Sequence, residues 1–392
     1  MKTDVCIIGA GPAGSTASLY LSKNKINHVI IDKATFPRDI VCGEGFRGTN
    51  VFWALEHLNP NYIKELQATT VDKMHWMKFC NNENKEFFIN LGDTSSFGGR
   101  RIDFDNFLVN KVKESNYANF MEGQTPKDIQ YKPSEGYELM VNGQKIEAKI
   151  LICATGATSY LPQKLGMPSK DKLEKVIGMR AHYKGLKEEG NGVGAVYFLD
   201  TLKGGYLWII PLYDGYFNVG MAIKEKVLKK NNWNVKQLFQ DCLEHPNIKN
   251  RFTNATLEEK AKGKFLHLPN YKVSLSSSHL MVAGSAGMAI DPATGNGVSH
   301  AMATGRYAAN HAVECLQKNV FSAKAMKEYD KSILKKLRGE RLVAKLYTYL
   351  VSKPRLVNFL IPLLSNNKTI SKFFKRKDVA TKIYTTFTRK QL

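Results

Sequence analysis

The sequence VCIIGAGPAG, residues 5–14, opens with a short apolar run and ends in a glycine-rich turn. An apolar run of this length is typical of a strand that is buried on both faces. The helix-forming stretch 13–21 and a second apolar run, HVIID at 28–32, follow it. Strand, glycine turn, helix and strand in this order predict one βαβ unit, and therefore an α/β fold.

The glycines of GAGPAG have separate roles in such a unit. Gly9 allows the tight turn, Gly11 lets a pyrophosphate approach the backbone, and Gly14 lets helix and strand pack closely. The N-terminus of the helix faces the phosphates. Asp32 ends the second strand 18 residues after Gly14, near the offset of about 20 residues at which an acid hydrogen-bonds a ribose hydroxyl. Because these features occur in register, we predict a dinucleotide site rather than ordinary strand-to-helix glycines.

Composition excludes several classes of protein. The chain has 392 residues, of which 43% are hydrophobic and 23% charged, so it is neither a disordered chain nor a multi-span membrane protein. The six cysteines form no CxxC pair, which favours reduced thiols in a cytoplasmic protein over a disulfide framework. No uninterrupted apolar stretch reaches the roughly 18–20 residues that a membrane-spanning helix needs.

The pattern along the chain predicts two sheets. We expect a discontinuous cofactor-binding domain of residues 1–70, 100–160 and 272–320. Strand-like runs rich in Tyr, Val, Phe and Trp from 176 to 223, bounded by glycines, indicate an inserted antiparallel sheet. We assign the substrate domain to 71–99 and 161–271, and a basic helical region to 321–392.

A second glycine-rich stretch follows the strand expected at 280–283. It reads GSAGMAIDPATGNG at 284–297 and precedes an alanine-rich helix expected from about 297 to 316. A glycine-bounded helix N-terminus offers N–H groups and a partial positive charge, which suit the electron-rich N1 and C2 carbonyl edge of a reduced flavin. The two stretches together indicate FAD, bound in a Rossmann-type domain by segments far apart in the chain.

The order of motifs resembles one family. GAGPAG is followed by FPRDIVCGE at 36–44, RxxFDxxL at 101–108, ATGATS at 154–159, YLWIIP at 206–211 and GSAGMAIDPATGNG at 284–297. This series resembles the geranylgeranyl reductase family of FAD flavoproteins, within the wider group of aromatic hydroxylases and halogenases, over residues 1 to about 320. The resemblance implies an FAD domain, an antiparallel substrate sheet and a helical C-terminal part. It also implies reduction of isolated carbon–carbon double bonds in polyprenyl chains or related lipids.

The resemblance also implies the cofactor residues. Cys42 and Gly43 match a CG pair beside the flavin, and Arg101 matches an arginine that supports FAD. With Lys33 and Thr125 as further candidates, the cofactor set is Gly9, Gly11, Ala13, Gly14, Asp32, Lys33, Cys42, Gly43, Arg101, Thr125, Gly284, Ser285, Gly295, Gly297 and Val298.

Three positions depart from the family pattern. Ser285 and Thr155 stand where related proteins carry Asp; both hydroxyls can form hydrogen bonds, but neither carries charge. Leu212 stands where the family has a basic residue after its YxWxFP motif, so this motif assigns no phosphorylated headgroup.

Three residues are candidates for contact with the substrate. Tyr206 and Trp208 alternate on an expected strand and so point to one face, either as a substrate wall beside the flavin or as core. Cys42 either places the substrate or donates a proton near the flavin, or it is a buried small hydrophobe. We take Tyr206 and Trp208 as substrate residues and Cys42 as the catalytic candidate.

These residues predict an FAD-dependent oxidoreductase that reduces an isoprenoid or other apolar polyene by hydride transfer from reduced flavin. One rival is a monooxygenase or halogenase of the same wider group; a halogenase would show WxWxIP, where this chain has Tyr206, and Lys78 is expected to be a strand-surface lysine. Another is a non-catalytic, flavin-containing membrane adaptor. The external donor, NAD(P)H or a ferredoxin, stays open because no second GxGxxG unit is present. The nine histidines show no metal-binding spacing.

The formal charge of +22 indicates an anionic partner. Residues 324–392 hold 18 Lys and Arg against 4 Asp and Glu. Leu342, Leu346 and Leu350 begin a series of apolar helical faces that continues to Leu364, with basic residues from Lys372 to Lys390 around them. Such a segment suits peripheral contact with an anionic membrane, or it packs over the substrate cavity. Nucleic acid is not expected, because no matching motif accompanies the charge.

Overall fold

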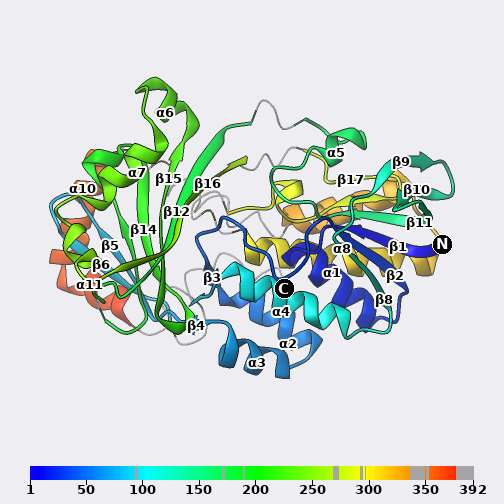
Figure 1. Cartoon of the computed structure of the whole chain (residues 1–392), viewed down its shortest axis with the longest axis horizontal. Coiled ribbons are helices and arrows are strands. Elements are labelled where there is room, and N and C mark those ends of the chain that lie inside the picture. Colours follow the sequence, from blue (N-terminus) through cyan, green and yellow to red (C-terminus); the bar gives the residue numbers. More distant parts are fainter. Residues whose placement is uncertain are drawn as a thin grey trace.

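The structure is a computed structural model that describes residues 1–92, 96–169, 173–188, 190–267, 273–291, 295, 297–335, 349 and 353–376. Its strands gather into two lobes that lie side by side, and the N-terminus lies at the far end of one of them (Figure 1). Parts of three predicted features lie outside the described residues: Pro292–Thr294 and Asn296 of the second glycine stretch, the apolar positions Leu342, Leu346 and Leu350, and the basic residues from 377 onward.

A mostly parallel sheet organises the first lobe, in the order β17-β18-β11-β1-β2-β8. The strands β1, β2 and β11 carry continuous buried apolar runs, which is the pattern of parallel strands covered on both faces. A hairpin of β9 and β10 extends β11. The bounds are β1 Lys2–Ile8, β2 His28–Asp32, β8 Ala118–Glu122, β9 Lys127–Lys132, β10 Gly136–Val141, β11 Gln144–Cys153, β17 Ser276–Ser277 and β18 Leu280–Val282.

Helices cover this sheet and bring distant segments together. The closest pair is α1 and α8, because a side chain at Gly305 of α8 would meet the backbone oxygen of Ala13 at 2.1 Å. Their apolar faces join α4 in one core. The helices of this lobe are α1 Pro12–Lys23, α2 Gly48–Leu58, α3 Asn61–Thr69, α4 Arg101–Lys113, α5 Leu161–Lys164 and α8 Val298–Lys318.

The second lobe is built on a sheet in the order β16-β12-β15-β14-β13-β5-β6, antiparallel except for the β13–β5 pair. Leu207 and Ile209 of β14 turn to one face, where they pack with α7. The opposite face carries Tyr206 and Trp208. The bounds are β5 Trp76–Cys80, β6 Glu86–Asn90, β12 Lys175–Lys184, β13 Val193–Tyr197, β14 Gly205–Pro211, β15 Tyr216–Lys224, β16 Thr256–His267, α6 Glu225–Lys230 and α7 Val235–Leu243.

A small sheet and short helical turns complete these lobes. The strands β3 Gly45–Arg47, β7 Ser96–Gly98 and β4 Asp72–Lys73 pair in the order β3-β7-β4. Gly98 is tight against the backbone of Pro211 in the second lobe, since a Cβ there would meet its oxygen at 1.8 Å. The 3-10 turns are η1 Asp200–Leu202, η2 Tyr213–Gly215, η3 Lys249–Phe252 and η4 Gly284–Gly287.

The C-terminal part divides between the lobes instead of forming one appendage. Helical residues 323–335 pack on the first lobe, where the Tyr329 hydroxyl donates to the Val282 carbonyl at 2.9 Å. The helices α10 Pro354–Asn366 and α11 Lys368–Lys375 pack against β6 of the second lobe, at the opposite end of the molecule from the N-terminus (Figure 1). Across the described ranges, every helix is too short or too polar to cross a bilayer.

Candidate functional site

The first glycine turn leaves an open cradle at Gly11. Gly9 has φ +104, and a Cβ there would lie 2.4 Å from the Ala154 carbonyl oxygen. A Cβ at Gly14 would lie 1.7 Å from the Gly9 carbonyl oxygen. At Gly11 the first atom met is Arg38 Nη2, at 3.6 Å. Gly9 and Gly14 are therefore required by packing, whereas Gly11 keeps a space open beside a cation.

This contrast yields a prediction about FAD retention. We expect Gly14→Ala to disrupt the turn and the fold of the first lobe, because its methyl group overlaps backbone atoms. Gly11→Ala should fold and yet bind FAD at least tenfold more weakly, because the methyl group occupies the space a pyrophosphate needs. Thermal unfolding and flavin titration of both variants check this; equal flavin affinity of Gly11→Ala and the parent would contradict the cradle.

Asp32 lies beside this turn, but its carboxylate already binds backbone. Ala10 N donates to Asp32 Oδ2 at 2.6 Å, and Ala34 N donates to Oδ1 at 2.8 Å. Each carboxylate oxygen can accept a further bond, so a ribose hydroxyl can still reach it. Lys33 and Thr125 are both exposed at this edge of the sheet, and Gln124 N donates to the Asp32 carbonyl at 2.8 Å.

The second glycine stretch meets the first. A Cβ at Gly284 would lie 2.9 Å from the Ala13 Cβ of α1. Gly284 N donates to Thr304 Oγ1 of α8 at 2.9 Å. Gly297 is the N-terminal cap of α8, whose first residue is the buried Val298. The structure therefore brings the two glycine-rich stretches together.

Ser285, which stands where related proteins carry Asp, lies in η4 close to the start of α8. A Cβ on Gly297 would be 3.5 Å from Ser285 Oγ. Gly295 lies beside the aromatic side chains of β14, because a Cβ on Gly295 would be 3.8 Å from the Tyr206 hydroxyl. The other replacement, Thr155, has its hydroxyl 3.4 Å from the buried Cys153 sulfur.

Arg101 is held by a buried acid that sequence reasoning missed. Its Nε and Nη2 donate to the two carboxylate oxygens of Asp105, both at 2.7 Å. Arg38 Nη1 donates to the same Asp105 Oδ2 at 2.7 Å. Burial alone would lower the pKa of Arg101, but Asp105 and then Cys42 raise it overall. Arg101 is thus buried beside Cys42, and Arg38 is the arginine that reaches the Gly11 cradle.

Further positive charge surrounds these arginines. Lys264 of β16 is half-buried, and burial followed by repulsion from Arg101 lowers its pKa. Arg38 and Lys33 contribute to that repulsion. Arg38 and Arg101 share one buried carboxylate, Asp105, and Lys264 and Lys33 add further positive charge near them, which is suited to phosphate groups.

Cys42 and Gly43 lie against the aromatic face of the second sheet. A Cβ on Gly43 would be 3.6 Å from the Trp208 ring, so the indole lies directly over this loop. Trp208 itself fits only because Gly220 is opposite: a Cβ there would lie 2.3 Å from the ring. The indole Nε1 donates to Asn218 Oδ1 at 2.7 Å, and Asn218 Nδ2 donates to the Cys42 carbonyl at 2.8 Å.

Glu44 connects these parts. It is 1% exposed and has φ 58, a conformation that is uncommon for a side chain of this type. Its Oε1 accepts from Arg101 N at 2.8 Å, and its Oε2 accepts from Asn218 Nδ2 at 2.8 Å. The same Oε2 lies 2.6 Å from His182 Nε2. One carboxylate thus joins the Cys42 loop, α4 and two strands of the second sheet.

A second ion-pair network continues along the sheet from His182. Its Nδ1 lies 2.9 Å from Glu259 Oε2. The fully buried Arg180 pairs with Glu259 and with Asp39. Burial alone would lower the pKa of Arg180, but Glu44 and the other carboxylates raise it, so the guanidinium stays charged. Asp39 lies in the loop that leads to Cys42, so this network also holds the two lobes together.

Tyr206 and Trp208 form the predicted aromatic wall, with ring centroids 6.1 Å apart. Burial, assisted by Asp291, raises the pKa of the Tyr206 hydroxyl to about 12, so it is neutral at physiological pH. Ile210 continues this face and packs with Met74 and Leu212. The wall is therefore apolar where it passes Cys42 and Gly43.

The open cradle at Gly11, the cations around Asp105 and the glycine-bounded start of α8 fit a dinucleotide with a flavin ring. Arg38 and the first turn would hold its phosphates, and the start of α8 its ring.

Comparison with known proteins points to the same chemistry. A family model described as pyridine nucleotide-disulphide oxidoreductase matches residues 3–188. A digeranylgeranylglycerophospholipid reductase of Methanococcus vannielii is 28% identical over 342 residues, 83% of this chain and 81% of that protein. A menaquinone reductase of Mycobacterium tuberculosis is 25% identical over 324 residues, 79% of this chain and 76% of that protein.

Solved structures show the same fold. A geranylgeranyl bacteriochlorophyll reductase-like protein from Thermoplasma acidophilum has a TM-score of 0.81 at 18% identity, covering 98% of this chain and 99% of that one. A flavin-dependent brominase has a TM-score of 0.76 at 22% identity, with both chains covered at 100%. Fold, site and relatives together define an FAD-dependent oxidoreductase. The relatives and the reductase-like structure are similar to this chain over most of its length, in agreement with the resemblance to the geranylgeranyl reductase family found in the sequence.

One sequence expectation is corrected here. Lys78 is not a surface lysine: it is 3% exposed, its Nζ donates to Glu86 Oε1 at 2.8 Å, and it lies 5.2 Å from the Tyr197 ring centroid. Tyr197 belongs to the core on the α7 side of the sheet. Because side chains alternate along a strand, Lys78 points away from the face that carries Trp208.

Proposed function

We propose that this enzyme reduces carbon–carbon double bonds of an isoprenoid or other apolar polyene lipid. The observation that carries the proposal is the packing of the Cys42–Gly43 loop against the Trp208 side of the second sheet, because it places this loop beside an apolar aromatic wall at the predicted flavin end of the site. The relatives named as digeranylgeranylglycerophospholipid reductases support a lipid substrate.

Alkene reduction adds one hydride and one proton, each to one carbon of the double bond. Bound FAD, once reduced, supplies the hydride. The protein's part is to hold the chain along Tyr206 and Trp208, exclude water, and deliver a proton to the second carbon. We assign proton delivery to the Cys42 thiol, which is half-buried, accepts from Glu44 N at 3.5 Å and belongs to the loop that lies against Trp208. Asn218 and Glu44 position it through the Cys42 carbonyl and the backbone that follows.

The test is anaerobic. Enzyme photoreduced with FAD should be reoxidised by a geranylgeranyl lipid, with a product heavier by two hydrogens for each bond reduced. The same measurement with NAD(P)H or reduced ferredoxin in place of light identifies the physiological donor. Flavin that stays reduced in the presence of geranylgeranyl and menaquinone-type lipids would contradict the proposal.

The variant Cys42→Ala tests the proton donor. Loss of a general acid slows a reaction by about 10²–10⁴-fold, so we expect alkene-dependent reoxidation to fall by that much while FAD absorbance and affinity stay unchanged. Cys42→Ser should recover part of the rate, because a hydroxyl at the same place can still donate. A Cys42→Ala enzyme as fast as the parent would exclude the thiol from proton delivery.

The structure disfavours the halogenase alternative. The brominase and halogenase structures share the fold at 22% identity or less, which does not carry over their chemistry. The lysine that sequence reasoning considered, Lys78, is paired on the opposite face of the sheet. A product that depends on oxygen or halide would establish the alternative, and tight FAD binding without any turnover would establish the non-catalytic adaptor.

A lipid substrate resides in a bilayer, so we further propose that the reaction takes place at a membrane surface.

A further inference from the structure

The helix α10 has an inner and an outer apolar face. Val357 and Ile361 pack on Phe87 of β6, at 6% and 5% exposure. Phe359 and Leu363 point the other way, with 64% and 49% of their surface exposed. A surface helix normally places polar residues opposite its packed face, so the outer face of α10 requires another explanation.

The following helix, α11, repeats this arrangement. Phe374 packs edge-on against Phe87, with ring centroids 5.2 Å apart, while its neighbour Phe373 is 45% exposed. Both helices are anchored to the sheet by backbone: Asn81 Nδ2 donates to the Asn358 carbonyl at 3.4 Å, and Asn90 Nδ2 donates to the Lys375 carbonyl at 3.3 Å. The exposed rings are therefore presented from a fixed platform. We call Phe359, Leu363 and Phe373 the outer apolar residues.

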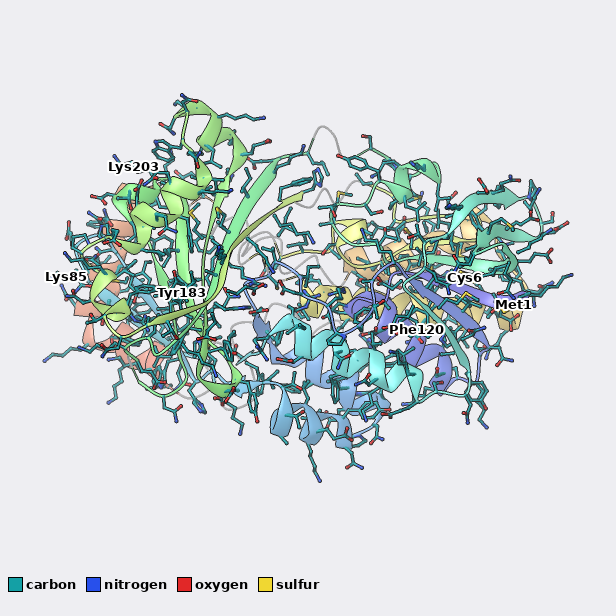
Figure 2. All side chains as sticks on the ribbon, viewed as in Figure 1. Met1, Cys6, Lys85, Phe120, Tyr183 and Lys203 are labelled. Atoms are coloured by element: carbon teal, nitrogen blue, oxygen red, sulfur yellow. The ribbon has the colours of Figure 1, made fainter. Side chains whose placement is uncertain are left out.

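The charge around these residues has one sign. Residues 353–376 contain six Lys and Arg and no Asp or Glu. Five of the cations are exposed, and none of the five forms an ion pair with a carboxylate in the described part of the chain; they are Lys353, Lys368, Lys372, Lys375 and Arg376. Figure 2 shows this end of the molecule, where Lys85 is labelled, with long side chains directed outward.

This platform adjoins the substrate wall. Three pairs of neighbouring strands place four residues in line. Trp208 of β14 lies opposite Val196 of β13, Val196 lies opposite Phe79 of β5, and Phe79 lies opposite Phe87 of β6. Residues directly opposite one another share a face of the sheet, so these four form one apolar row. The row spans three strand spacings, roughly 14 Å, and ends under α10.

We propose that α10 and α11 dock this enzyme on the surface of an anionic lipid bilayer, with the outer apolar residues inserted at the headgroup boundary. This inference rests on the proposed lipid substrate. An apolar face surrounded by unpaired cations is the arrangement that binds such a surface. A second copy of this face would bring two sets of unpaired positive charges together, which is unfavourable. The apolar row then leads from the membrane toward Trp208.

Cosedimentation of the full chain with vesicles tests the docking face. We expect binding to vesicles of phosphatidylglycerol and phosphatidylcholine, at least tenfold weaker binding to phosphatidylcholine alone, and weakening with salt. Phe359→Ser with Leu363→Ser, or Lys372→Glu with Lys375→Glu, should reduce binding about tenfold or more. Matched controls lie in the first lobe: Lys127→Glu with Lys164→Glu changes the net charge equally, and Tyr131→Ser removes an aromatic ring that is 44% exposed. The controls should bind like the parent.

Three outcomes would overturn the inference. The first is equal binding of the parent to anionic and neutral vesicles. The second is a loss of vesicle binding in the control variants as large as that in the docking variants. The third is a dimer in light scattering that the Phe359 and Leu363 changes dissociate, without vesicle binding. Flavin reoxidation by detergent-solubilised lipid separates membrane docking from the proposed function. The docking variants should reoxidise at the parent rate in this assay. A parent enzyme that is not reoxidised in it would contradict the proposed chemistry and leave the docking inference untouched.

Discussion

Asp105→Asn is expected to lower the free energy of unfolding by about 3–5 kcal/mol and to release most of the FAD, because it leaves a buried charge without its partner. Asp105 is fully buried and accepts three hydrogen bonds, two from Arg101 and one from Arg38. Asparagine keeps a single oxygen and no charge. Arg101, 7% exposed, would then lie unpaired beside Cys42, and Arg38 would lose the group that holds it near the Gly11 cradle.

The matched control is two residues away on the same helix. Asp103 pairs with Arg100 at 2.8 Å, but both side chains are about one-third exposed, at 38% and 32%. Pairs exposed to this extent contribute about 0–1 kcal/mol, so Asp103→Asn should change neither unfolding nor flavin content appreciably. Thermal unfolding and the flavin-to-protein absorbance ratio measure both effects. An Asp105→Asn protein as stable and as yellow as Asp103→Asn would contradict the role of this carboxylate.

Glu44→Gln is expected to slow alkene reduction roughly ten- to hundredfold, because one buried hydrogen bond lost or opposed costs about 1–3 kcal/mol. The Glu44 carboxylate faces Arg101 N, Asn218 Nδ2 and His182 Nε2. In Glu44→Gln, one of the two carboxylate oxygens becomes an NH₂ group. That NH₂ group would face a nitrogen that now meets an oxygen. If Asn218 turned to compensate, it would break its bonds to Trp208 and to the Cys42 carbonyl.

The control for Glu44 acts on the same imidazole from its other side. Glu259 lies 2.9 Å from His182 Nδ1 and also pairs with Arg180, but its side chain is 27% exposed and Arg180 keeps Asp39 as a partner, so water can replace the contacts that Glu259→Gln removes. We expect its rate to stay within about threefold of the parent. A positioning role predicts that Glu44→Gln lowers the rate while FAD affinity holds and Trp208 fluorescence shifts. Equal rates for the two variants, with unchanged fluorescence, would exclude that role.

Local patterns predicted the cofactor turns well. Gly14 is required by its contact with Gly9 within one βαβ unit, and such a contact follows from residue spacing, whereas Gly9 is tight against Ala154, which follows β11. The second stretch, 284–297, was placed at the flavin end through the same reasoning and the family resemblance, and the structure brings Gly284 against Ala13. The alanine-rich helix expected from about 297 to 316 was confirmed as Val298–Lys318.

Sequence reasoning missed Glu44 and Asp105 although both lie in quoted motifs, FPRDIVCGE and RxxFDxxL. A signal was present, since an acid within an otherwise apolar motif must find partners once buried. No comparable signal marks His182, Asn218 or Arg180, which lie on ordinary-looking strands. Their roles depend on β12 and β15 pairing in register, with His182 opposite Asn218.

The sequence by itself determined the kind of cofactor turn, the two-sheet organisation and the class of chemistry, because spacing of glycines and apolar residues acts over a few neighbours in the chain. Only the tertiary structure decided which polar side chains meet at Cys42 and which face of α10 remains exposed. Those contacts join residues more than a hundred positions apart, such as Glu44 with His182 and Asn81 with Asn358. Their formation depends on sheet register and on the docking of one lobe against the other.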